Sequence, residues 1–135
     1  MAEEKFFELK IITPDRTFYE GKVSMVEFAT TEGEMGIYRE HIPLTAVLVP
    51  TVVVITEAEG QKEAALHSGF VEVLPDRVTI LAEIAEWPDE IDANRAEEAR
   101  VRAERRLQMK DPNINTQRAE LALRKSLIRL RVAKQ

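Results

Sequence analysis

Five basic side chains near the C-terminus are spaced so that they could bind phosphate. Arg95 and Arg102 are seven residues apart, which places them two turns apart on one face of a helix. Arg118, Lys125 and Arg129 are separated by seven and four residues, so they also share a face. Guanidinium groups match phosphate oxygens in geometry and keep their charge at any physiological pH. If the two helices pair antiparallel, these cations would converge on one cleft.

Two other interpretations of these cations stay open. They could form a solvated charged face with pairs such as Glu98 and Arg102, which are four residues apart. They could also bind an acidic protein or a nucleic acid. Nucleic acid fits less well, because few aromatic residues lie among the cations and the N-terminal region is acidic.

The chain of 135 residues has a net charge of −5 that hides two regions of opposite sign. Residues 1–90 contain 7 basic and 18 acidic side chains, a net of −11. Residues 91–135 contain 12 basic and 6 acidic side chains, a net of +6. We therefore expect two regions that face different partners.

The acidic region has the pattern of a β-rich domain. Short runs rich in Val, Ile, Phe and Thr are separated by turn residues such as Gly60, Gly69 and Pro75. Because no helical pattern intervenes, a sandwich or barrel is favoured over a βαβ sheet. We expect strands at 6–12, 17–19, 22–30, 44–49, 51–56, 62–67, 70–74 and 78–84.

The basic region predicts two helices. Ala, Glu and Arg dominate residues 89–110, and all three favour helix. Pro112 interrupts this helix, and a second helix is expected from 115 or 116 to 133. The two form an αα-hairpin. Its expected seams are Ala96, Ala99, Ala103 and Leu107 on one helix, and Ala119, Leu123, Leu127 and Leu130 on the other.

An alanine-rich seam buries little apolar surface, so we expect the hairpin to be weakly held. Trp87 marks the boundary between the two regions and is expected to pack there, although stacking on the base of a ligand stays open.

Several classes of chemistry are not expected. The sequence has no cysteine and only two histidines, which argues against thiol catalysis and against a metal site. It contains no phosphate-binding loop, nucleophile elbow or HExxH motif, so no catalytic residues are expected. The longest apolar-rich run covers residues 46–55, about half of a membrane span, so no direct membrane insertion is expected.

Two signatures make the chain resemble the epsilon subunit of bacterial F-type ATP synthase. Residues 33–37 followed by 41–44 are similar to the family's Gly-Glu-x-Gly-Ile…Gly-His-x-Pro-Leu. Residues 68–73 followed by 75–82 are similar to its Gly-Gly-Phe-x-Glu-Val…Val-Thr-Ile-Leu-Ala. Arg39 and Glu40 replace the usual Pro-Gly before the histidine, and Ser68 replaces the first Gly of the Gly-Gly pair.

The resemblance implies an α+β fold with an N-terminal β-sandwich of about ten strands at 1–87 and a C-terminal antiparallel α-helical hairpin at 88–135. It implies a non-catalytic subunit of the rotor's central stalk that couples the gamma subunit to the c-subunit ring for proton-driven ATP synthesis. The loop with Glu34 would face the c ring and the segment with His41 would face gamma. The chain would be peripheral, on the cytoplasmic face of the cell membrane.

The resemblance also implies that the hairpin is a mobile brake. Folded, it lies on the sandwich; extended, it reaches the alpha and beta subunits and inhibits ATP hydrolysis. In part of the family ATP, with Mg²⁺ as a candidate companion, favours the folded hairpin through an Ile/Leu-Asp-x-x-Arg-Ala motif. Residues 91–96 match this motif in full. The alternative is a free-standing nucleotide sensor or adaptor with a basic hairpin.

The implied ATP contacts fall into two groups. Glu86, Ile91 and Asp92 would lie toward the base and ribose, and Ala96 completes the motif. Arg95, Arg102, Lys125 and Arg129 would lie toward the phosphates. Lys125 stands where the family has an arginine, so it keeps the charge and loses the planar fork. Arg124, next to it, could partly substitute.

Overall fold

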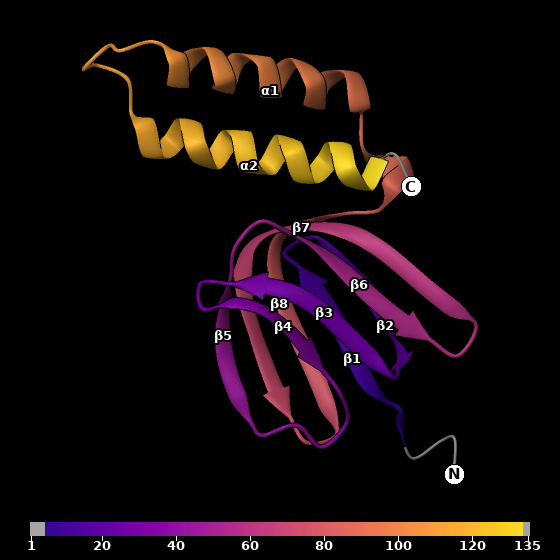
Figure 1. The fold of residues 1–135 in the computed structure, drawn as a ribbon. Helices are drawn as coiled ribbons and strands as arrows, with labels where there is room; N and C mark the ends of the chain where they lie inside the picture. The colour runs from indigo at the N-terminus through magenta and orange to yellow at the C-terminus, as the bar shows by residue number, and fades with distance from the viewer. Residues whose placement is uncertain (1–4, 134–135) are drawn as a thin grey trace.

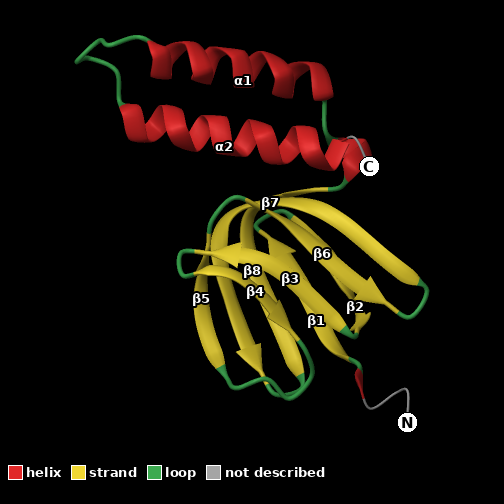
Figure 2. Cartoon of the chain, viewed as in Figure 1, coloured by secondary structure: helices red, strands yellow, loops and turns green. Residues whose placement is uncertain are grey.

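The structure, a computed structural model, describes residues 5–133 and divides them into a β-sandwich and a helical hairpin (Figures 1 and 2). Within these residues the chain forms eight strands, a 3₁₀ turn and two helices. The strands are β1 (Phe7–Thr13), β2 (Arg16–Val23), β3 (Met25–Thr30), β4 (Gly33–Ile37), β5 (Leu44–Leu48), β6 (Thr51–Glu57), β7 (Gly60–Leu74) and β8 (Arg77–Glu86). The 3₁₀ turn Pro88–Glu90 leads into α1 (Ala93–Gln108), and α2 (Thr116–Ala133) follows.

The strands run in the order β2-β1-β8-β7-β5-β3-β4, and β6 pairs with β3 and β7. The long strand β7 connects the two layers, because its first half pairs with β6 and its second half pairs with β5. Alternate side chains of the strands point inward to one core. Among its members Leu9, Ile11, Leu66 and Ile80 are completely buried. Each such side chain contributes about 1.5–3 kcal/mol by burial.

The fold confirms the sandwich and corrects the strand count from about ten to eight among the described residues. The single strand expected at 22–30 is broken at Ser24, because Val23 and Val26 are both buried and an alternating strand cannot bury residues three apart. The expected strands 62–67 and 70–74 form one strand, β7. Strand β4 was not expected from the sequence, because its two glycines have low β-propensity.

The two departures from the family signature lie where the backbone is left-handed. Glu40 has φ 63° and Ser68 has φ 58°, and they are the only non-glycine residues with positive φ in the range 5–133. These turns therefore have the left-handed backbone that glycine adopts easily, and each non-glycine residue in this conformation costs about 1–2 kcal/mol. At Gly69 no such replacement is possible, because a Cβ would lie 1.9 Å from the carbonyl oxygen of Leu81.

Helix α1 begins later than the sequence suggested, whereas α2 begins at Thr116, as expected. Residues 88–90 form the 3₁₀ turn, and α1 begins after Asp92, whose Oδ1 accepts a hydrogen bond from the Arg95 backbone at 3.1 Å. Asn115 caps α2 in the same way, since its Oδ1 accepts from the Arg118 backbone at 3.1 Å. Short polar side chains that accept from the third residue onward are the usual start of a helix.

The helices α1 and α2 pack through small residues, as predicted, with Ala96, Ala103 and Ala119 buried. The prediction that Leu127 belongs to this seam is wrong, because its side chain is 47% exposed. Ser126 is buried in its place, and its hydroxyl donates to the Leu123 carbonyl at 2.8 Å. The seam thus follows a spacing of four, three and four residues from Ala119 to residue 130.

Helix α2 lies between α1 and the sandwich (Figure 1). Its Val132 and Ile128 pack against Val52 and Val54 of β6 and against Ala65 of β7. At the turn before β6, Nε of Arg124 donates to the carbonyl of Pro50 at 2.9 Å. Neither helix is long and apolar enough to cross a membrane, judged on the described residues.

Candidate functional site

A cleft of about 340 Å³ lies where the hairpin meets the end of β8. It brings together seven of the eight residues implied as ATP contacts: Glu86, Ile91, Asp92, Arg95, Ala96, Arg102 and Arg129. Glu90 and Ala99 complete its lining. The eighth, Lys125, is half-buried one turn before Arg129 on α2 and is not part of the lining.

Three guanidinium groups face this cleft from two helices. Arg95 and Arg102 lie two turns apart on α1, and the cap at Asp92 fixes where that helix begins. Arg129 reaches in from α2. For the side chains of Arg95 and Arg102, no hydrogen bond or ion pair is recorded with any residue in the range 5–133. Two cations that have no partner among the described residues and that line a half-enclosed site suit an anionic ligand.

The pairing expected between Glu98 and Arg102 is not recorded among the described residues. Arg100 makes that kind of contact instead, with Glu97 and with Glu104 at 2.7 Å. The solvated charged face therefore exists on α1, and it lies beside the cleft cations rather than including them.

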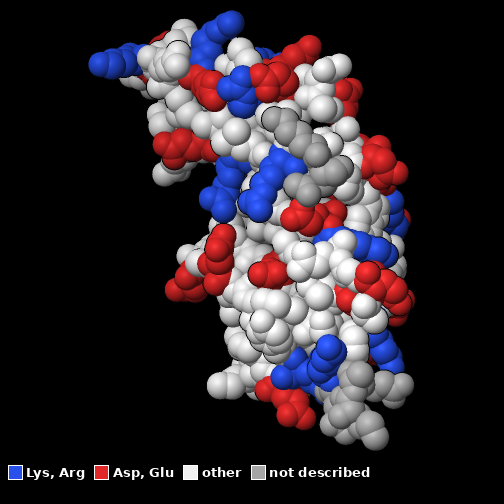
Figure 3. All heavy atoms as spheres, turned by 45° about the vertical axis from the view of Figure 1, so that its right-hand side comes forward, with Lys and Arg blue, Asp and Glu red and all other residues white. Residues whose placement is uncertain are grey.

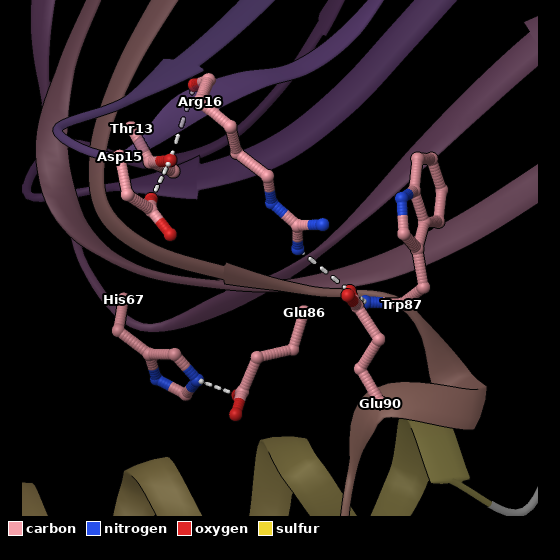
Figure 4. Close-up of polar contacts among 7 residues, drawn as sticks. All are labelled: Thr13, Asp15, Arg16, His67, Glu86, Trp87 and Glu90. Atoms are coloured by element: carbon pink, nitrogen blue, oxygen red, sulfur yellow. Dashed lines mark hydrogen bonds and ion pairs between the residues drawn. The ribbon is translucent and has the colours of Figure 1, made fainter.

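Glu86 joins the sandwich to the hairpin. Its Oε1 lies 3.0 Å from Nε2 of His67 on β7 (Figure 4). The same oxygen accepts from Nε of Arg129 at 2.8 Å. Partial burial alone would raise the pKa of this carboxyl, but the hydrogen bonds from His67 and Arg129 and the charge of Arg129 lower it below its usual value. Glu86 is thus held as a carboxylate at the edge of the cleft.

Glu90 fixes the connection between the two regions. Its Oε1 accepts from Nη2 of Arg16 at 2.8 Å and from the Trp87 backbone at 2.9 Å (Figure 4). The hydrogen bond from Arg16 is the main reason why the pKa of Glu90 is lowered. The Trp87 ring stacks on Phe18, with centroids 4.3 Å apart and planes at 16°. Trp87 is therefore a packing residue, as predicted, and it does not line the cleft.

Sequence reasoning missed three residues of this region. Arg16 and Glu90 are 74 positions apart, and no local pattern pairs them. His67 was expected only as a strand or loop residue with a hydrogen-bonded ring, which is confirmed, but its partner Glu86 was not foreseen. The sequence did contain a signal for Glu90, since it follows the helix-start residue Trp87 by three positions, where an acidic side chain completes a capping box.

Arg124 is not placed to substitute for Lys125. Besides its bond to Pro50, it lines a second groove, which lies under α2 and has a volume of about 600 Å³. Arg131 lines the same wall, and Glu27 and Glu34 lie across the groove on β3 and β4. Figure 3 shows basic side chains of the hairpin facing acidic side chains of the sandwich across a hollow. The positive charge that lines the cleft comes from Arg95, Arg102 and Arg129.

The residues expected to contact partner subunits lie apart from each other. Glu34 is exposed on β4 and belongs to the groove under α2. His41 is partly exposed in the loop between β4 and β5, with Nδ1 3.0 Å from the Ile42 carbonyl. The preceding Glu40 donates its backbone N–H to Pro75 in the β7–β8 turn, at the end of the sandwich away from the hairpin.

No group of three or more His, Cys, Asp or Glu residues that could hold a metal ion was found among residues 5–133. The described residues thus form an acidic sandwich, a basic hairpin docked on it and a cationic cleft between them.

Comparison with known proteins identifies the family. Residues 6–88 match the family model of the ATP synthase delta/epsilon chain β-sandwich domain, and residues 89–134 match that of its long α-helix domain. The ATP synthase epsilon chain of Halalkalibacterium halodurans is 50% identical over 126 residues, covering 93% of this chain and 95% of the relative. That of Caldanaerobacter subterraneus subsp. tengcongensis is 44% identical over 131 residues, with 96% and 95% covered.

A solved structure shows the same fold. A chain in the cryo-EM structure of the Euglena gracilis mitochondrial ATP synthase, OSCP/F1/c-ring in rotational state 1, superposes with a TM-score of 0.82 at 23% identity. The match covers 96% of this chain and 82% of that one. The chain belongs to the ATP synthase delta/epsilon chain family, and its relatives are epsilon chains, as the resemblance indicated. The prediction of a non-catalytic subunit is thereby confirmed.

Proposed function

We propose that the chain works in the central stalk of an ATP synthase, where it couples the gamma subunit to the c-subunit ring for proton-driven ATP synthesis at the cytoplasmic face of the cell membrane. Its hairpin restrains ATP hydrolysis when extended, and ATP favours the folded hairpin. The epsilon-chain names of the relatives support the place in the complex. A solved structure with the same fold, titled for the Tetrahymena thermophila mitochondrial ATP synthase central stalk and c ring, fits that place.

The observation that carries the regulatory part is the position of the cleft. Its walls come from β8, α1 and α2, so a ligand in it touches all three elements only while the hairpin is docked. A ligand shifts a conformational equilibrium by its differential affinity for the two states. At a ligand concentration 100 times the dissociation constant, binding to the docked state alone stabilises that state by about 2.7 kcal/mol.

The chemistry of the lining fits ATP. Arg95, Arg102 and Arg129 supply guanidinium groups for the phosphates, and Lys125 adds positive charge from the next turn of α2. Glu86, Asp92 and Ile91 form the other side, where two acceptors and an apolar side chain suit a ribose and a base. Mg²⁺ would enter with the phosphates of the nucleotide.

The outer face of the sandwich offers a surface for gamma. Val47, Phe70 and Leu81 are 45%, 55% and 50% exposed and are direct neighbours across β5, β7 and β8. Contiguous exposed apolar side chains on a small domain are typical of a protein interface. The His41 loop carries two more exposed apolar side chains, Tyr38 and Ile42. The His41 loop is therefore our proposed contact region for gamma, and Glu34, which lies apart on β4, is our proposed contact for the c ring.

The extended hairpin has the length and charge for a distant partner. Helices of 16 and 18 residues opened end to end would span roughly 50 Å at about 1.5 Å per residue. The net charge of +6 on residues 91–135 suits acidic surfaces of the alpha and beta subunits.

Isothermal titration of the isolated chain with ATP tests the site. We expect Arg95→Ala to weaken ATP binding by about 10- to 100-fold, because a hydrogen bond to a charged group contributes about 1.5–3 kcal/mol. In the reconstituted complex, the same variant should be inhibited more strongly at a given ATP concentration, since less ATP would be bound to hold the hairpin down.

Arg105→Ala is the matched control, since Arg105 is an exposed arginine of α1 outside the cleft. It should bind ATP like the parent chain. Equal ATP affinity in the parent and Arg95→Ala would refute the cleft as the nucleotide site.

A further inference from the structure

His67 is a buried polar side chain directly behind the cleft. It lies on β7 and is 1% exposed, and neighbouring Ala65 on the same face of that strand packs against α2. Its Nε2 lies 3.0 Å from Oε1 of Glu86. Its Nδ1 is buried and has no hydrogen-bond partner among residues 5–133. The contact with Glu86 is therefore the polar contact that orients the packed ring.

The direction of this hydrogen bond follows from its partner. Glu86 is held as a carboxylate, which can only accept, so the ring hydrogen is on Nε2 and points to Oε1. Arg129 donates to the same oxygen at 2.8 Å. Two donors on Oε1 prevent the carboxylate from rotating, and they come from opposite sides of the boundary between the sandwich and the hairpin.

The second oxygen of Glu86 is thereby left for a ligand. No hydrogen bond to Oε2 is recorded from any residue in the range 5–133, and Glu86 lines the cleft. Figure 4 shows this oxygen turned away from His67, toward the helices. A fixed carboxylate oxygen accepts from an N–H donor and repels a carbonyl oxygen.

We propose that His67 is the positioning residue that fixes Glu86 as an acceptor in the cleft and so selects a nucleobase carrying an amino group, as adenine does, over one carrying a carbonyl oxygen at that place. This inference rests on the proposed nucleotide site and adds the residue that sets its base preference. His67 itself does not touch the ligand.

Positioning of Glu86 and mere support of the hairpin have different effects on nucleotide affinity. A variant that only weakens hairpin docking lowers the fraction of binding-competent chain, and this lowers the apparent affinity for every nucleotide by the same factor. A variant that frees the Glu86 carboxylate changes the ratio of affinities for two bases. The ratio is therefore the quantity to measure.

The test compares ATP with inosine triphosphate, which has a carbonyl oxygen where ATP has the amino group, by isothermal titration of the full chain. In His67→Leu, which keeps the buried volume and removes the donor, we expect the preference for ATP to fall about tenfold. His67→Gln places an amide N–H donor on β7 and should keep the preference within about twofold. Val132→Ala, which trims the docking contact, should weaken both nucleotides equally.

The outcomes separate this inference from the proposed function. An unchanged ratio in His67→Leu, or equal binding of both nucleotides by the parent, overturns the role of His67 while ATP binding stands. A parent that binds neither nucleotide overturns the nucleotide site as well. If His67→Leu does not fold, Glu86→Gln replaces it, because its amide can donate or accept and should bring the ratio close to one.

Discussion

The core of the sandwich is much larger than the apolar contact that holds the hairpin on the sandwich. Twenty buried apolar side chains form the sandwich core, whereas the contact between hairpin and sandwich buries three, Val52, Ala65 and Val132. Val54, Ile91 and Ile128 pack against these three while only partly buried. Polar contacts from Arg129 to Glu86 and from Arg124 to Pro50 complete the interface. Because burial of apolar surface dominates stability, we expect the sandwich to be the more stable part and the hairpin to be released by smaller changes.

The largest effect should come from the sandwich core. Leu66→Ala should lower the free energy of unfolding by about 2–5 kcal/mol, because Leu66 is completely buried and the change leaves a cavity. Urea denaturation followed by circular dichroism measures this value.

The matched change in the hairpin contact is Val132→Ala, which should weaken docking by about 1.5 kcal/mol, at about 0.8 kcal/mol for each methyl group removed. Hydrogen exchange of α2 should accelerate while exchange of β7 and β8 stays the same. Faster exchange throughout the sandwich in Val132→Ala would show that the two parts unfold together, which would contradict the difference in stability between them.

Acid should release the hairpin before it unfolds the sandwich. The pKa of Glu86 is lowered from its usual 4.5 in the folded chain, so its contribution to docking is complete above pH 4.5. That contribution is lost as the pH falls through the lowered value, because the protonated group no longer pairs with Arg129. Hydrogen exchange of α2 between pH 7 and pH 3, corrected for the intrinsic rate, measures the loss.

Glu86→Gln is the control for this titration, since the amide carries no charge at any pH. Its docking should be weaker than that of the parent at pH 7, and the two should become equal at low pH. A parent whose α2 protection does not change across this range would show that the carboxylate does not hold the hairpin.

Local sequence patterns predicted the features that depend only on residues close together in the chain, such as which side chains share a helix face. The motif at 91–96 and the helical spacings of Arg95, Arg102 and Arg129 predicted side chains that the structure brings together in one cleft, because a helix fixes which residues share a face. That these residues bind ATP stays a prediction. The strand β4 was missed, because its glycines carry no β signal and only pairing with β3 makes it a strand.

Contacts between distant segments could not be predicted. The pair of Arg16 with Glu90 and the contact of His67 with Glu86 depend on how β2, β7 and β8 are brought together, and nothing in the local sequence reports this. Leu127 was placed in the helix seam because its apolar type outweighed the spacing, whereas the geometry selected Ser126.

The smallest effect on stability and docking should come from charged side chains that pair only within the hairpin. Arg100 pairs with Glu97 and Glu104 on the exposed side of α1, where water and salt weaken ion pairs. Arg100→Ala should leave the urea midpoint and the exchange of α2 at their parent values, although it removes as much formal charge as Arg129→Ala. If Arg100→Ala released α2 as strongly as Arg129→Ala, net charge rather than the contact with Glu86 would hold the hairpin down.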